Sequence, residues 1–163
     1  MPFIIRYPQE IKRSATNSSM VLNVDFAPTL LDCASVQIPA DIQGRSFRSM
    51  FQEQVPPEWR HSMYYRYWMH LAHFHIKAHY GMRTERYKLI YYYAEALGVE
   101  GAIDETKPTE WELFDLERDP YELYNVYDHP DYSDTVRELK KELIKLRQEV
   151  KDDSCDFRLE QRL

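Results

Sequence analysis

The sequence predicts an α+β fold, in which a four-stranded antiparallel sheet packs against a long C-terminal helix. Two observations lead to this prediction. Four short aromatic segments with strand character follow one another in the middle of the chain, which favours antiparallel neighbours. The last third of the chain instead repeats apolar residues with a helical period. A stretch containing Pro56 and Pro57 separates these elements from a first segment of different character.

Residues 1–55 are predicted to contain a strand, a helix and a loop. Phe3-Ile4-Ile5 is an apolar run that stops at Pro8, as expected of a buried strand ending in a turn. A helix is predicted over residues 26–34. Pro28 is tolerated in its first turn, because the missing N–H would have had no intrahelical partner there.

Residues 56–163 are predicted to form the domain that holds the sheet and the long helix. The predicted strands are 63–68, 79–84, 88–93 and 111–116. Each is rich in aromatic residues or alternates apolar and polar side chains, as strands with one buried face do. Residues 94–109, which contain two glycines and a proline, form a long excursion between the third and fourth strands.

The long helix is predicted from an apolar stripe near the end of the chain. Its members are Val136, Leu139, Leu143, Leu146 and Val150, spaced 3, 4, 3 and 4 residues apart. This spacing places all of them on one helical face. A helix laid on the sheet is the favoured interpretation, because a coiled coil would need more heptads than the stripe contains.

Composition narrows the possible functions. The 163 residues carry 21 Lys+Arg and 27 Asp+Glu, a net charge of −6, which weighs against a nucleic-acid partner. No apolar run reaches the roughly 18 residues that a membrane span needs, so no membrane partner is expected. With 4 glycines and neither a P-loop nor a dinucleotide-binding motif, the chain is not expected to cradle a nucleotide.

A cluster of histidines is the most conspicuous candidate for chemistry. His70, His73, His75 and His79 fall within ten residues of one another. A metal site would fit this density, but no cysteine and no H-E-x-x-H pattern accompanies it. The favoured interpretation is a loop of partly exposed histidines beside an aromatic sheet. In a third interpretation, one or two of them form hydrogen bonds to a polar ligand near the sheet edge.

No self-sufficient active site is apparent in the sequence. There is no serine in a G-x-S-x-G motif, and Cys33 has an acidic neighbour, Asp32, that would raise its pKa. Three closely spaced carboxylates precede Pro120, namely Asp115, Glu117 and Asp119. Their pattern is typical of a turn and a helix start.

Five segments, in this order along the chain, resemble motifs of the sulfatases. They read MPFIIRYP (1–8), NVDFAPTLLD (23–32), QGRS (43–46), RTERYKLI (83–90) and WELFDLERDPYELYN (111–125). The last two are similar to the family patterns R-T-x-R-Y-K-L-I and W-E-L-Y-D-L-x-x-D-P-x-E-x-x-N. Any one match is weak evidence, but five in the right order are specific.

The resemblance implies the C-terminal part of a sulfatase of the alkaline-phosphatase-like superfamily. Residues 1–55 would then be a remnant of the large α/β catalytic domain, and residues 56–163 the smaller α+β domain. In this family Asp25 corresponds to a structural residue at a helix start and not to a metal ligand. The resemblance further implies a periplasmic, secreted or lysosomal location.

The catalytic groups of the family are not expected in this chain. Sulfatases use Ca²⁺ and a formylglycine hydrate made from Cys or Ser in C/S-x-P-x-R, and neither Cys33 nor Cys155 stands in such a motif. The resemblance therefore implies no catalytic residue, metal ligand or cofactor in this chain. Ca²⁺ and formylglycine are expected in the full-length family enzyme. The expected protein partner is the N-terminal catalytic half, or a second copy of the chain.

What the chain could contribute is selection of the substrate. Residues 64–81 most resemble sulfatases that act on sulfated glycans such as mucin or glycosaminoglycan sugars. The resemblance implies substrate-binding roles for His79 first, then His70, then Arg66, whose guanidinium could meet a carboxylate or sulfate. The alternatives are that the aromatic residues only pack the sheet, or that the chain is a non-catalytic module that binds a carbohydrate or a protein partner.

Overall fold

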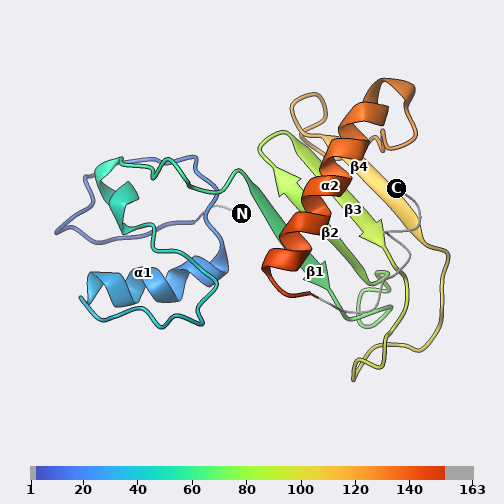
Figure 1. The fold of residues 1–163 in the computed structure, drawn as a ribbon, viewed down its shortest axis with the longest axis horizontal. Coiled ribbons are helices and arrows are strands. Elements are labelled where there is room, and N and C mark those ends of the chain that lie inside the picture. Colours follow the sequence, from blue (N-terminus) through green and yellow to red (C-terminus); the bar gives the residue numbers. More distant parts are fainter. Residues whose placement is uncertain (1–2, 153–163) are drawn as a thin grey trace. The chain divides into compact units, whose positions relative to one another are not determined.

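The computed structural model describes residues 3–152 of the chain (Figure 1). The chain divides into two compact units, residues 1–60 and residues 61–163. No helix within residues 3–152 is long and apolar enough to cross a bilayer.

The first unit is built around one helix. A 3₁₀ turn at Asn23–Asp25 leads directly into α1 (Phe26–Cys33), which confirms the helix expected there, and a second 3₁₀ turn spans Arg48–Gln52. The buried apolar core of this unit consists of Phe47, Met50, Phe51 and Trp59. Because this core is small, polar contacts must contribute much to the order of the unit.

The strand expected at Phe3-Ile4-Ile5 does not form, so this part of the prediction is wrong. No other segment of residues 3–152 forms a ladder with it. A strand is stable only where its backbone N–H and C=O groups are paired. The Phe3 ring instead stacks on the Phe26 ring of α1, with 4.7 Å between ring centres, and the Ile4 side chain is 89% exposed.

The second unit contains the four-stranded antiparallel sheet that the sequence predicts. Its strands are β1 (Ser62–Tyr67), β2 (His79–Thr84), β3 (Tyr87–Tyr92) and β4 (Glu110–Asp115), in the order β1-β2-β3-β4. In β2, Gly81 lies opposite Tyr65 of β1 and Ile90 of β3. A Cβ atom at Gly81 would lie 2.4 Å from the Leu89 carbonyl oxygen and 2.8 Å from the Tyr65 hydroxyl, so only glycine fits there.

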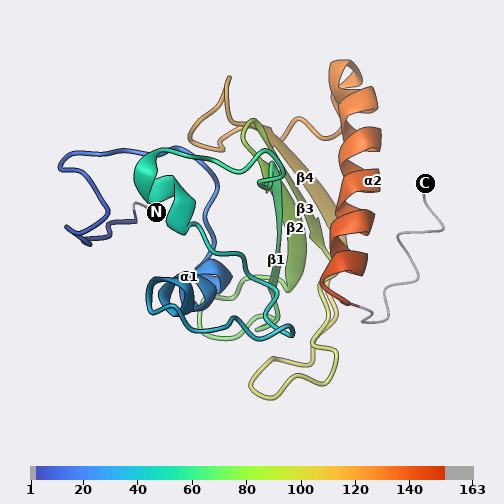
Figure 2. The same ribbon diagram turned by 60° about the vertical axis from the view of Figure 1, so that its left-hand side comes forward.

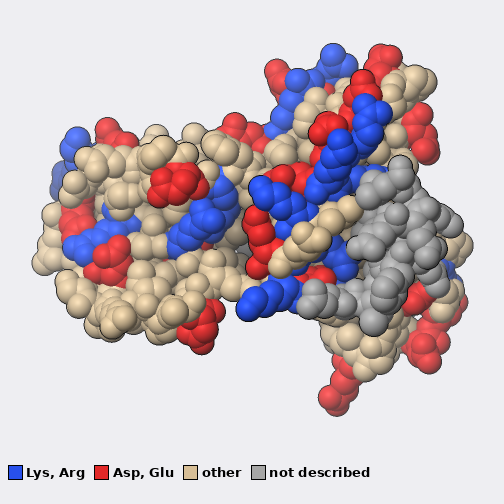
Figure 3. All heavy atoms as spheres, in the orientation of Figure 1, with Lys and Arg blue, Asp and Glu red and all other residues tan. Residues whose placement is uncertain are grey.

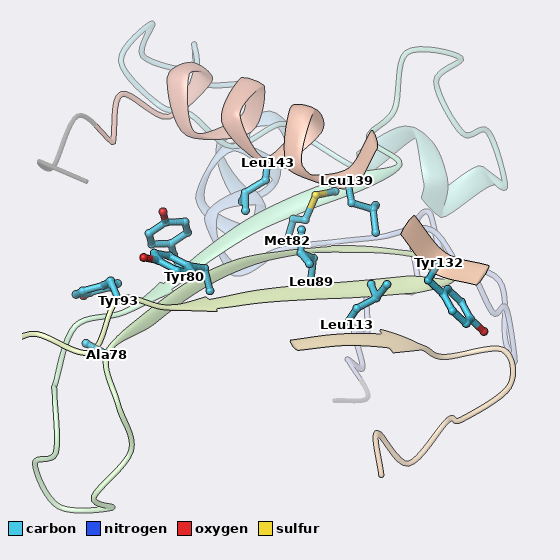
Figure 4. Close-up of a cluster of buried hydrophobic side chains, with 10 residues drawn as sticks. Ala78, Tyr80, Met82, Leu89, Tyr93, Leu113, Tyr132, Leu139 and Leu143 are labelled. Atoms are coloured by element: carbon cyan, nitrogen blue, oxygen red, sulfur yellow. The ribbon is translucent and has the colours of Figure 1, made fainter. Parts of the chain in front are cut away.

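Helix α2 (Ser133–Glu149) lies on one face of this sheet (Figure 2). Its buried residues Leu139 and Leu143 point toward Met82 of β2 and Leu89 of β3 (Figure 4). On its other side, positive and negative side chains are intermixed (Figure 3), with ion pairs such as Lys141–Glu138. The stripe therefore packs on the sheet, as the favoured interpretation predicted.

One buried carboxylate at the end of β4 predicts how the second unit responds to acid. Asp115 accepts hydrogen bonds from Arg86 Nε (3.0 Å), Arg86 Nη2 (2.8 Å) and Tyr132 Oη (3.0 Å). The bonds from Arg86 outweigh the opposing effect of burial and lower the pKa of Asp115 to about 2. Because the unfolded chain binds this proton near pH 4, stability from Asp115 is complete above about pH 4 and declines between about pH 4 and pH 2.

We expect the Asp115→Asn variant to lose this part of the acid dependence, on the order of 1–2 kcal/mol between pH 4 and pH 2. The free energy of unfolding would be measured through urea unfolding at several pH values. The exposed Asp131→Asn variant is the control and should keep the wild-type slope. An unchanged slope in Asp115→Asn would contradict the role of this carboxylate.

Candidate functional site

The face of the sheet opposite α2 carries a compact group of aromatic side chains, here called the aromatic cluster: Tyr65, Tyr67, His79 and Tyr92. Side chains alternate between the two faces of a strand. Tyr64 and Tyr80 pack on the α2 side, so Tyr65 and His79 point to the other face. The register places Tyr67 opposite His79, and His79 opposite Tyr92, across three strands.

His79 is the centre of the aromatic cluster. Its ring centre lies 5.4 Å from that of Tyr67, in a stacked arrangement, 4.9 Å from that of Tyr92 and 6.1 Å from that of Tyr65. Polar groups border the rings: the Tyr92 hydroxyl donates to Glu112 Oε2 at 2.9 Å, and Lys77 Nζ lies 5.8 Å from the Tyr92 ring centre. The cluster thus combines apolar ring faces with hydrogen-bonding groups.

The protonation state of His79 follows from its surroundings. Nδ1 lies 2.9 Å from the Lys77 carbonyl oxygen, and a carbonyl can only accept, so Nδ1 carries the hydrogen. Burial lowers the pKa of His79 and thereby favours the neutral ring. A neutral imidazole with its hydrogen on Nδ1 presents Nε2 as an acceptor, which suits a hydroxyl group of a ligand.

Tyr65 completes the base of the aromatic cluster. Its ring lies over Gly81, and its hydroxyl is buried with no hydrogen-bond partner among residues 3–152. Burial raises the pKa of this hydroxyl, so it stays a neutral donor. Such an unpaired donor is unusual in a buried position and leaves a hydrogen-bonding capacity unused.

His70 lies apart from the aromatic cluster and is fully buried, with 0% of its surface exposed. Its Nδ1 accepts the Ala78 N–H at 3.0 Å, and its Nε2 lies 2.8 Å from the Glu105 carbonyl oxygen. Both ring nitrogens therefore contact the backbone of this chain. The ligand contact expected for His70 stays a prediction, and the structure adds a role in holding loops.

Arg66 points to the α2 side of the sheet. Its guanidinium pairs with Asp152 at 2.7 Å and lies 3.6 Å from the Trp68 ring centre, and its side chain is only 5% exposed. A ligand anion would have to compete with Asp152 for it. The structure thus places Arg66 on the opposite face of the sheet from His79, and it groups His79 with tyrosines instead.

The remaining histidines are candidates for a metal centre only by their spacing in the sequence. Within residues 3–152, no group of three or more His, Cys, Asp or Glu side chains is placed to hold a metal ion. His73 and His75 lie on the exposed loop between β1 and β2. His73 and His75 thus fit the favoured interpretation of exposed loop histidines. Hydrogen bonding of a histidine to a ligand stays a prediction.

Comparison with known proteins gives a consistent result. The family model described as N-sulphoglucosamine sulphohydrolase, C-terminal, matches residues 1–149. An N-acetylglucosamine-6-O-sulfatase of Bacteroides thetaiotaomicron is 39% identical over 96% of this chain and 26% of its own length. An ulvan-active sulfatase of Formosa agariphila is 27% identical over 94% of this chain and 29% of its own length.

Among solved structures, one is described as a complex with its substrate D-glucosamine-2-N,6-O-disulfate. Its sequence is 38% identical to this chain, and the structures superpose with a TM-score of 0.82 over 94% of this chain and 29% of that one. The chain thus spans less than a third of the length of the relatives that it matches.

Proposed function

Because the chain belongs to the N-sulphoglucosamine sulphohydrolase C-terminal family of sulfatases, we propose that it is the segment of a sulfatase that helps to select a sulfated glycan. The enzyme as a whole would hydrolyse sulfate esters of such glycans. The aromatic cluster is the observation that carries this proposal. Its ring faces and its neutral histidine match the two kinds of surface on a sugar, the apolar C–H faces and the hydroxyl groups.

Within the proposed site, His79 binds the sugar directly. Its Nε2 accepts a hydroxyl hydrogen, while Tyr67 and Tyr92 offer ring faces on either side of it. Arg66 would take part only if its pair with Asp152 opened toward an anionic group. The relatives named for N-acetylglucosamine-6-O-sulfatase activity and for a glucosamine disulfate complex support an amino sugar as the substrate class.

The chemistry of ester cleavage is proposed to come from another part of the enzyme. The sequence has no C/S-x-P-x-R motif for formylglycine, and the described residues do not fit a calcium site. The buried carboxylate of Asp25 is engaged by Arg60 and two backbone N–H groups. The chain by itself is therefore proposed to bind substrate and not to cleave it.

The first unit supplies a surface for that catalytic part. A cavity of about 560 Å³ opens among apolar side chains of this unit, including Phe3, Ile4, Phe47 and Phe51. Covering such apolar surface is favourable by about 25 cal/mol per Å². We propose that the N-terminal catalytic half of a sulfatase packs here, with a second copy of this chain as the alternative occupant.

The proposal predicts that the chain alone is inactive and that it restores activity when joined to a catalytic half. The purified chain should release no sulfate from N-acetylglucosamine 6-sulfate. A chimera would place it in the Bacteroides thetaiotaomicron sulfatase instead of the matching 26% of that enzyme, and should release sulfate. In that chimera, His79→Ala should lower kcat/KM by roughly ten- to a hundredfold, since a lost hydrogen bond to substrate costs about 1–3 kcal/mol.

The exposed His61→Ala variant is the matched control and should leave kcat/KM unchanged. Sulfate release by the isolated chain would contradict the division of roles. An inactive chimera, together with sugar binding by the isolated chain, would favour a non-catalytic carbohydrate-binding module.

A further inference from the structure

A single peptide unit is held between two histidines. The Lys77 carbonyl oxygen accepts the hydrogen of His79 Nδ1 at 2.9 Å. The N–H on the other side of the same peptide bond, that of Ala78, donates to His70 Nδ1 at 3.0 Å. His70 and His79 thus contact opposite ends of one rigid, planar group.

The two rings must carry their hydrogens on different nitrogens. An N–H group can only donate, so His70 Nδ1 is bare, and its Nε2–H donates to the Glu105 carbonyl oxygen. A carbonyl can only accept, so His79 Nδ1 carries the hydrogen and its Nε2 is bare. The arrangement therefore pairs an Nε2–H tautomer at His70 with an Nδ1–H tautomer at His79.

The surroundings of the peptide keep it from tilting. Ala78 and His70 are both fully buried. The Ala78 carbonyl accepts the Ala94 N–H at 3.1 Å, and the His70 carbonyl accepts the Ile103 N–H at 2.9 Å. His70 consequently joins the loop before β2 to the excursion between β3 and β4. The residue that follows Ala78 is His79, the first residue of β2.

We propose that His70 is a positioning residue for His79. By holding the Ala78 N–H, it keeps the Lys77 carbonyl aimed at His79 Nδ1, and this leaves His79 Nε2 bare as the acceptor for a sugar hydroxyl. The inference deepens the proposed function and rests on it for the sugar contact. It also assigns His70 a role different from the direct ligand contact expected from the resemblance.

The first test needs no variant. Long-range ¹H–¹⁵N correlation spectra of the 163-residue chain distinguish protonated from bare imidazole nitrogens. At neutral pH we expect the protonated-nitrogen shift at Nε2 for His70 and at Nδ1 for His79. Finding both residues in the same tautomer would overturn the proposal.

The second test compares two amide replacements. In His70→Asn, the side-chain oxygen can stand near the place of Nδ1 and still accept the Ala78 N–H, but it loses Glu105. In His70→Gln, the longer side chain can reach Glu105 but gives up the short contact to Ala78. Unchanged Leu89 and Ile90 amide shifts would establish that each variant is folded.

We expect His70→Asn to keep the Nδ1–H tautomer of His79 and His70→Gln to lose it. Retention in both variants, loss in both, or the reverse order would each overturn the proposal. Titration with N-acetylglucosamine 6-sulfate gives an independent readout, with the resonances of Tyr67 and Tyr92 expected to shift. If these resonances do not shift, the result contradicts the sugar site. The tautomer result then decides the positioning role by itself.

Discussion

Replacing Leu143 with alanine is expected to lower the free energy of unfolding of the second unit by roughly 2–5 kcal/mol. Leu143 is fully buried, and it points from α2 onto the sheet beside Met82 and Leu89 (Figure 4). Its removal leaves a cavity between two rigid layers, which can close only in part. Hydrogen exchange of the Leu89 and Ile90 amides, in the central strand β3, would measure the effect.

The matched control is Lys141→Ala on the same helix. The Lys141 side chain is 60% exposed and pairs with the exposed Glu138, a contact worth at most a few tenths of a kcal/mol. Its replacement should change the exchange of the same amides very little. Equal effects of the two substitutions would mean that α2 does not pack on the sheet as described.

The elements of the second unit could be predicted because each depends on a local pattern. The spacing of Leu139 and Leu143 fixes which face of α2 is apolar, whatever that face meets. The aromatic segments around Tyr65 and Ile90 have strand character in their own sequence. A strand at Phe3-Ile4-Ile5 had the same local support, but it needs partners that no local pattern can supply.

The candidate site was less predictable, because it depends on which residues face each other across strands. The resemblance pointed to His79, but Tyr92 joins it only through the register between β2 and β3. Arg66 had the right chemistry for an anionic sugar, yet it pairs with Asp152, which lies 86 residues further along the chain. Alternation within β1 could have separated Arg66 from Tyr65 and Tyr67, and this signal was available in the sequence.

Asp25 links the parts of the first unit that its small core cannot hold. Its carboxylate accepts hydrogen bonds from the Leu22 N–H (2.8 Å), the Arg45 N–H (2.9 Å) and Arg60 Nη2 (2.8 Å). Gly44 makes this approach possible, because a Cβ there would lie 1.9 Å from the Val24 carbonyl oxygen. One buried side chain thus joins the start of α1, the loop at Gly44 and the end of the unit.

Replacing Asp25 with alanine is therefore expected to destabilise the first unit by about 3–5 kcal/mol, because Arg60, whose side chain is only 13% exposed, loses its anionic partner. Hydrogen exchange of the Phe47 amide, which donates to Thr29 Oγ1, would report the loss. The double variant Asp25→Ala/Arg60→Ala should recover part of the stability, since no charge is then left buried without a partner. Glu10→Ala, which breaks the more exposed pair with Arg48, is the control and should cost much less than Asp25→Ala, because solvent screens that pair. If Asp25→Ala and Glu10→Ala lower the stability of the first unit equally, Asp25 is not the buried link that these contacts indicate.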